Sequence, residues 1–125
     1  MNKEVISTEK APAAIGPYVQ GMSVDSLVFT SGQLPLDPVS GAMPATVYDQ
    51  TVRSLQNVAA ILEKAGSDMS KVIRLGVFLK DMNDFAEMNN AYASFFPGDA
   101  PCRTTVEVAR LPKDALVEID AIACR

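Results

Sequence analysis

Two features in the C-terminal quarter of the chain have the chemical character of a binding or catalytic site. Arg103 follows Pro101 at the start of a predicted strand, so a stiff turn would present its guanidinium, whose forked donors suit a carboxylate. Glu118 and Asp120 are two residues apart and therefore share one strand face. Paired carboxyl groups act as general acid and base where their surroundings separate their pKa values. Each pattern alone is more often a surface charge or a structural ion pair.

Two glycine-containing turns in the first third of the chain could border a small ligand. Gly32, within Thr30-Ser31-Gly32-Gln33, ends a predicted strand and leaves room for close approach to the backbone. The stiff turn Gly16-Pro17 fixes Tyr18, whose hydroxyl can donate a hydrogen bond. The ordinary alternatives are a plain strand-ending glycine and a tyrosine at the edge of the core.

The composition excludes several kinds of chemistry. The chain has no histidine, which excludes Ser-His-Asp and Cys-His nucleophiles and histidine-ligated metals. Cys102 and Cys124 lack the spacing of a redox or metal pair, which favours reduced thiols and a cytoplasmic protein. The acidic residues of 81–87 match no metal loop, so we predict no metal. A net charge of −4 without a basic cluster argues against nucleic acid as the main partner.

A single domain, 1–125, must position these residues, because 125 residues leave no room for two independent cores. No apolar run is long enough to span a membrane, and the N-terminal residues lack the apolar segment of a signal peptide. Periodicity predicts helices over Val47–Ala65 and Asn83–Phe96, the first with Thr46 as N-cap and Gly66 after its end. Strands are predicted over Lys3–Ser7, Tyr18–Met22, Leu27–Ser31, Val72–Lys80, Thr104–Arg110 and Leu116–Cys124.

This order of elements predicts an α+β fold, in which two helices pack on one face of a β-sheet. In the last strand Val117, Ile119, Ala121 and Ala123 form the natural helix-facing side. The opposite, helix-free side of this strand carries Glu118 and Asp120. We expect two other strands to contribute to the same face of the sheet, one with Arg103, Thr105 and Glu107 and the other with Arg74, Gly76 and Phe78. Such a mixed apolar and charged face favours a subunit interface over an ordinary solvated sheet face.

Three segments of the chain resemble the RidA/YjgF family, the reactive-intermediate deaminases that also bear the older name L-PSP endoribonucleases. The resemblance runs from about Glu4 to the C-terminus. Its motifs are Ala11-Pro12-Ala13-Ala14-Ile15-Gly16-Pro17-Tyr18-Val19-Gln20-Gly21, Thr30-Ser31-Gly32-Gln33, and Val106-Glu107-Val108-Ala109-Arg110-Leu111-Pro112-Lys113-Asp114 followed by Val117-Glu118-Ile119-Asp120-Ala121-Ile122-Ala123.

This resemblance implies a chorismate-mutase-like fold and a homotrimer with clefts between subunits. It also implies a cofactor-free enzyme that hydrolyses enamines and imines released by pyridoxal-phosphate enzymes, such as threonine or serine dehydratase, to 2-oxoacids and ammonia. The expected partners are therefore small 2-imino and 2-oxo acids and two further copies of the chain, with neither nucleic acid nor membrane.

The resemblance also assigns roles to single residues. Arg103 matches the arginine that binds the substrate carboxylate, and Glu118 matches the acid that positions or activates water. The residues that match the lining of the family's cleft are Tyr18, Ser31, Gly32, Phe85 and Asn89. Thr105 stands where relatives often have cysteine, in a segment, 101–105, that departs from the usual Pro-Ala-Arg-Ser-Cys. The 96–100 loop is also shorter than in many members, so the shape of the cleft wall and the substrate preference are expected to differ.

Two rival functions remain beside imine hydrolysis. The first is an RNA-cleaving or translation-inhibiting protein, which the negative charge and the lack of imidazole disfavour. The second is a sensor that binds a small carboxylate without turnover. The joint presence of Arg103 and Glu118 favours the enzyme, because a carboxylate receptor needs the arginine but not the acid.

Overall fold

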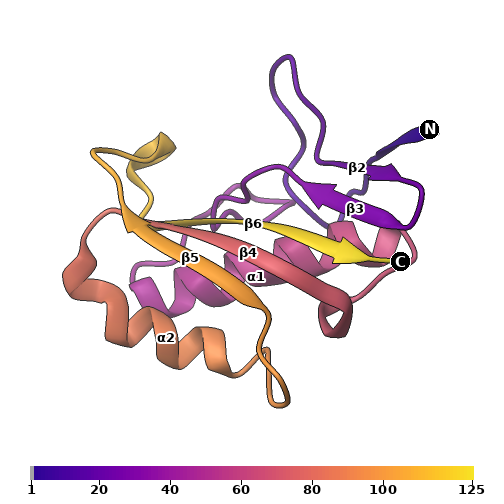
Figure 1. Ribbon diagram of the computed structural model, residues 1–125. Coiled ribbons are helices and arrows are strands. Elements are labelled where there is room, and N and C mark those ends of the chain that lie inside the picture. The colour runs from indigo at the N-terminus through magenta and orange to yellow at the C-terminus, as the bar shows by residue number, and fades with distance from the viewer. Residues whose placement is uncertain (1) are drawn as a thin grey trace.

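The structure, a computed structural model, describes residues 2–125 and has two layers, a β-sheet and a pair of helices. Both helices lie on one side of the sheet, below it in Figure 1, so the predicted α+β arrangement is confirmed. Within residues 2–125 no helix is both long and apolar enough to cross a bilayer.

The sheet has six strands in the order β1-β2-β3-β6-β4-β5. All neighbouring strands are antiparallel except β4 and β5, which are parallel. The C-terminal strand therefore lies in the middle of the sheet, and the strand that bears Arg103 lies at its edge. The bounds are β1 Lys3–Ile6, β2 Gly21–Val24, β3 Leu27–Thr30, β4 Val72–Leu79, β5 Cys102–Glu107 and β6 Val117–Cys124.

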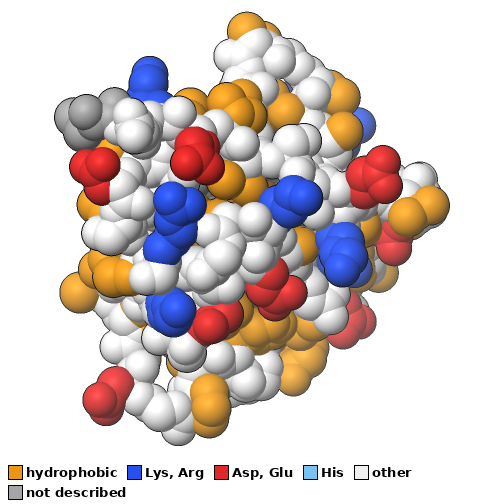
Figure 2. All heavy atoms as spheres, turned by 90° about the vertical axis from the view of Figure 1, so that its right-hand side faces the viewer, with side chains coloured by type: hydrophobic (Ala, Val, Ile, Leu, Met, Phe, Trp, Pro, Cys, Tyr) orange, Lys and Arg blue, Asp and Glu red, His pale blue; other side chains and the backbone are white. Residues whose placement is uncertain are grey.

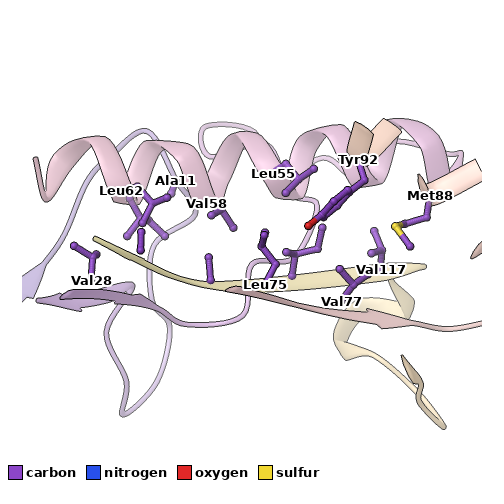
Figure 3. Close-up of a cluster of buried hydrophobic side chains, with 14 of the residues drawn as sticks. Ala11, Val28, Leu55, Val58, Leu62, Leu75, Val77, Met88, Tyr92 and Val117 are labelled. Atoms are coloured by element: carbon purple, nitrogen blue, oxygen red, sulfur yellow. The ribbon is translucent and has the colours of Figure 1, made fainter. Parts of the chain in front are cut away.

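The long helix α1, Val47–Lys64, packs its apolar stripe onto the middle of the sheet. Its ends are as predicted: Thr46 accepts a hydrogen bond from the Asp49 amide, and Gly66 has a positive φ of 83° just beyond the C-cap. Figure 3 shows side chains of α1 facing those of β4 and β6 across the core. The fully buried side chains that meet there include Leu55, Val58, Leu62, Leu75, Val77 and Val117.

The second helix is shorter than its apolar pattern predicts. A single 3₁₀ turn, η2 (Met82–Asp84), precedes α2, which spans Phe85–Ala93 rather than reaching Phe96. The Asp81 side chain accepts a hydrogen bond from the Asn83 amide and so starts the 3₁₀ turn before the helix proper. Beyond Ala93 the backbone makes i to i−3 hydrogen bonds, from Ser94 to Ala91 and onward, which end the α-helix.

Two loops rise from the side of the sheet that the helices leave open. One joins β1 to β2 over residues 7–20 and stands highest in Figure 1; the other joins β5 to β6 over residues 108–116 and contains the 3₁₀ turn η3, Pro112–Asp114. The predicted strand Tyr18–Met22 is wrong in its first part, because Tyr18 and Val19 belong to the first loop and β2 begins only at Gly21. These loops border the open face of the sheet.

Candidate functional site

The segment Ser31-Gly32 leaves the sheet beside β6. Thr30 ends β3 and accepts a hydrogen bond from the Ala121 amide through its side chain, while Gln33 pairs with Ile119 in an isolated bridge. Residues 30–33 therefore span only residues 119–121 of β6, so one extra residue must bulge out. The Ser31 amide and hydroxyl bond the carbonyls of Gln20 and Val19, which ties this bulge to the 7–20 loop.

Glu118 lies against this bulge on the open face of the sheet. A side chain on Gly32 would place its Cβ 2.8 Å from Oε2 of Glu118, so only glycine permits this approach. Glu118 also borders a cavity of about 490 Å³. The other lining residues include Tyr18, Ser31 and Gly32, so four predicted site residues meet there, together with Lys113 from η3 and Gln20 and Gln33.

The 7–20 loop owes its shape to the buried amide of Gln20. Its Oε1 accepts a hydrogen bond from the Thr8 amide, and its Nε2 donates to the carbonyls of Thr8, Ala11 and Pro12 at 2.7–3.1 Å. The Tyr18 amide bonds the Gly16 carbonyl at 2.8 Å, which confirms the predicted tight turn. Tyr18 is half exposed and borders the Glu118 cavity.

Arg103 belongs to a second cluster, which β5 forms with α2. Its guanidinium lies 4.7 Å from the ring centroid of Tyr92 and 5.5 Å from that of Phe85. Its Nη1 donates to Oδ1 of Asn89 at 2.7 Å. The predicted residues Phe85, Asn89 and Arg103 therefore lie together, and two rings and one amide hold the guanidinium in a fixed orientation. Thr105 lies on the same strand face, and its buried hydroxyl has no hydrogen-bond partner within residues 2–125.

The two clusters occupy opposite faces of the sheet. Arg103 is in register with Leu75, a core residue, and contacts α2, whereas Glu118 alternates with the buried residues of β6 and faces the open side. The expectation that Arg103, Thr105 and Glu107 share the helix-free face with Glu118 is therefore wrong, although these three do share a face. Gly76 and Phe78 of β4 do lie on the open face, opposite Asp120 and Glu118.

Burial perturbs one ionisable group in each cluster. Burial raises the pKa of Glu118 above its ordinary value of 4.5, and the negative charge of Asp120 raises it further. Burial also raises the pKa of Tyr92, against a smaller opposing effect of the Arg103 charge. A half-buried carboxyl group with a raised pKa, bordering a cavity, is typical of a group that exchanges protons during a reaction.

Sequence reasoning missed Tyr92 and Lys113 as candidate site residues. Its position in the sequence places Tyr92 among the apolar residues of the predicted Asn83–Phe96 helix, and the structure does bury it, but its ring also covers Arg103. The spacing of Phe85, Asn89 and Tyr92 at i, i+4 and i+7 could have revealed that the three share one helix face. Lys113 carries a positive φ of 57° in η3, and no local pattern signals that its loop folds over the cavity.

The end of the molecule at which β6 finishes, away from Glu118, carries charges of both signs. On the face in Figure 2 acidic and basic side chains are interspersed, and apolar atoms gather on the raised 7–20 loop at the top. That loop contributes Pro12, Ala13 and Ile15 to the wall of the Glu118 cavity. The wall is therefore largely apolar around a few polar groups, which suits a small ligand more than a polyanion.

Comparison with known proteins identifies the family. The model of the family described as Endoribonuclease L-PSP matches residues 8–125, almost the whole chain. The chain belongs to this family, which the sequence motifs indicated under the name RidA/YjgF.

Individual relatives are similar over their full length. The 2-iminobutanoate/2-iminopropanoate deaminase of Salmonella typhimurium is 52% identical over 125 residues, 98% of each chain. Among solved structures, E. coli TdcF with bound serine and the E. coli YjgF gene product each align with a TM-score of 0.95 at 50% identity, again over 98% of each chain. The fold and the motif-bearing segments are thus those of this family.

Proposed function

We propose that this protein is a cofactor-free deaminase that hydrolyses 2-imino acids. Water adds to the carbon of the protonated imine, the carbon–nitrogen bond breaks, and the products are a 2-oxoacid and ammonium. The observation that carries the proposal is the pair of clusters: a fixed guanidinium for the substrate carboxylate and a half-buried carboxyl group for the proton transfers. The name of the Salmonella typhimurium relative and the serine bound to E. coli TdcF point to small ligands that bear a carboxylate.

Arg103 is suited to hold that carboxylate. Its side chain pairs with no carboxylate within residues 2–125, where the only ion pair joins Arg110 and Asp114. The Asn89 amide uses one terminal nitrogen, which leaves further donors for a ligand. Because the rings of Phe85 and Tyr92 fix the guanidinium, less conformational freedom is lost when a carboxylate binds.

Glu118 is suited to manage the protons. As a carboxylate it takes a proton from the attacking water, and as a carboxylic acid it returns that proton to the departing nitrogen. Such transfer contributes about 10²–10⁴-fold to a rate. Ser31, Gly32 and Tyr18 form the adjoining wall, and Thr105 lies beside Arg103 at the other cluster.

The site requires more than one copy of the chain. Since Arg103 and Glu118 face opposite sides of one sheet, a single chain cannot bring both to one small substrate. A homotrimer, in which the helix-side cluster of one subunit meets the open-face cavity of the next, resolves this separation. The open face also carries half-exposed apolar side chains, Phe29 and Val106, which an interface would cover.

The direct test couples a threonine dehydratase to detection of 2-oxobutanoate, with and without this protein. We expect the protein to accelerate release of the 2-oxoacid. The Arg103→Ala variant should lose at least about 10²-fold in kcat/KM, because the bidentate anchor is gone. Arg125→Ala, which removes an exposed arginine at the C-terminus, is the matched control and should leave the rate unchanged. Full activity of a folded Arg103→Ala variant would contradict the anchor.

RNA cleavage is the second candidate, because the matching family model carries the description Endoribonuclease. The net charge of −4 and the absence of histidine disfavour phosphate binding and imidazole acid–base chemistry. Binding of a labelled RNA should therefore be weak at physiological salt. Submicromolar, salt-dependent RNA binding with cleavage would reverse the order of the two candidates.

A further inference from the structure

Asp120 occupies a fixed position beside Glu118. The two carboxyl groups are two residues apart on β6 and share the open face of the sheet. Asp120 does not extend into solvent: its Oδ1 accepts a hydrogen bond from the Gly76 amide of β4 at 3.0 Å. The neighbouring strand thus holds a second negative charge next to the residue proposed to transfer protons.

Gly76 makes this arrangement possible. It lies directly opposite Asp120 in the β4–β6 register, and a Cβ there would come within 2.5 Å of Oδ1. Any larger residue at position 76 would push the Asp120 carboxylate off the Gly76 amide. A glycine in the interior of a central strand normally weakens that strand, so its presence here needs such a local reason.

We propose that Asp120, anchored by Gly76, is a positioning residue that fixes a negative charge beside Glu118 and so keeps Glu118 protonated to a higher pH than burial alone would. The inference rests on the proposed function only where it concerns the pH dependence of imine hydrolysis. Removal of the Asp120 charge should make Glu118 release its proton at lower pH, because a like charge favours the protonated form.

Within one chain, the other groups that face Glu118 come from four further elements. Lys113 of η3 and Tyr18 of the 7–20 loop border the same cavity. β4 places Phe78 opposite Glu118, and its Arg74 lies farther along the open face, opposite Ile122. The 31–32 bulge contributes Ser31 and Gly32, which carry no charge. None of these residues is acidic, and Asp120 is the acidic group whose charge acts on Glu118.

The experiment follows Glu118 directly and through activity. Asp120→Asn keeps an oxygen that can accept from the Gly76 amide but removes the charge. The titration midpoint of Glu118, measured by carboxyl-carbon NMR, should move to lower pH by more than the change in Asp25→Asn. That control removes one negative charge from the exposed β2–β3 turn, where Asn tolerates the positive φ of 53°. The acid limb of the kcat/KM profile for imine hydrolysis should move in the same direction.

Gly76→Ala separates the anchor from the charge. It should displace the Glu118 midpoint in the wild-type background, and this displacement should vanish in the Asp120→Asn background, because the effect passes through the Asp120 charge. Asp120→Ser replaces Asp120→Asn if the latter does not fold. Equal Glu118 midpoints in the Asp120 variants and the Asp25→Asn control would overturn the inference. Absence of imine hydrolysis by the wild-type protein would instead overturn the proposed function. The NMR titration of Glu118 would then still test the inference about Asp120.

Discussion

Glu118 lies in a setting that favours its neutral form. It is half-buried, its Oε2 occupies the space that a Cβ at position 32 would need, and the nearest acidic group on its strand is Asp120. Both burial and the neighbouring charge oppose ionisation, and this has a consequence for folding as well as for chemistry.

The first prediction concerns Glu118→Gln. Because the pKa of Glu118 is raised in the folded protein, its contribution to stability is complete below the ordinary value of 4.5 and is lost as pH rises through the folded pKa. Gln, which never ionises, should therefore gain stability relative to wild type as pH rises from about 4 to about 8. Urea unfolding at both pH values measures this difference in stability, and a difference that does not change with pH would contradict the raised pKa of Glu118.

Tyr92 combines a useful ring with an unpaired hydroxyl. The ring covers Arg103, whereas Figure 3 shows the hydroxyl directed into the layer between the helices and the sheet. Within residues 2–125 this buried hydroxyl has no hydrogen-bond partner.

The second prediction compares two substitutions of Tyr92. Tyr92→Phe keeps the ring and removes an unpaired polar group, so stability should stay within about 1 kcal/mol of wild type or rise. Tyr92→Leu removes the ring from Arg103 and leaves a cavity, which should cost about 2–3 kcal/mol and raise the KM for the imine. Thermal or urea unfolding and the coupled assay give both readouts. Equal stability and equal KM in the two variants would show that the Tyr92 ring does not position Arg103.

At the scale of elements, one buried amide joins α1 to the segment that leads from the 31–32 bulge. Asn57 is fully buried, and its Nδ2 donates to the carbonyls of Leu34 and Leu36 at 3.0 and 2.9 Å. Its Oδ1 accepts from Arg53. Leu34 and Leu36 border the Glu118 cavity, so α1 shapes one wall of the site without contributing to it directly.

The third prediction is that Asn57→Ala destabilises the protein by about 2–3 kcal/mol, because two carbonyls lose their donors. Amide hydrogen exchange should rise over residues 33–37 more than elsewhere. Asn90→Ala, at an exposed position of α2, is the matched control and should change stability by less than about 0.5 kcal/mol. Equal effects of the two substitutions would show that the hydrogen bonds of Asn57 to Leu34 and Leu36 do not stabilise the fold.

Most of these elements could be predicted from periodicity. The alternation of Val117, Ile119 and Ala121 gave the helix-facing side of β6, and Thr46 and Gly66 marked the ends of α1. The face of β5 could not be predicted, because Arg103 and Thr105 look like a polar, solvent-facing side. They lie on the helix side of the sheet, where Arg103 contacts α2. A side chain that stacks on aromatic rings looks like a solvated charge until the helix above it is placed.

The candidate site divides in the same way. The motifs identified the members of both clusters, including Glu118 with Gly32 and Arg103 with Asn89. Their distribution over two faces depends on the parallel pairing of β4 with β5, which is a long-range contact that local sequence does not encode. The position of Lys113 in the cavity wall could not be predicted either, because the path of the 108–116 loop also depends on contacts between distant parts of the chain.

At the scale of the whole molecule, the fourth prediction combines two variants that should each be inactive under the proposed function, Arg103→Ala without the carboxylate anchor and Glu118→Gln without the proton-transfer group. Arg103→Ala retains Glu118, and Glu118→Gln retains Arg103, so a mixed trimer contains some boundaries with both groups intact. With equal co-expression and random assembly, about one quarter of the boundaries should be complete in a ring of three subunits. The coupled assay should therefore recover about that share of the wild-type rate, whereas each variant alone stays inactive.

Light scattering provides the accompanying measurement, with three times the 13.4 kDa chain mass expected for wild type and for both variants. A mixed trimer without any recovered rate would place both groups in the same subunit's site, contrary to their positions on opposite faces of the sheet.

Arg103 and Glu118 lie on opposite sides of one sheet, so under the proposed function a folded, isolated chain would hold two half-sites and no complete site. Turnover per chain would then fall on dilution as the subunits separate, even though every chain keeps its native fold. Association of the subunits would itself control the activity of this enzyme.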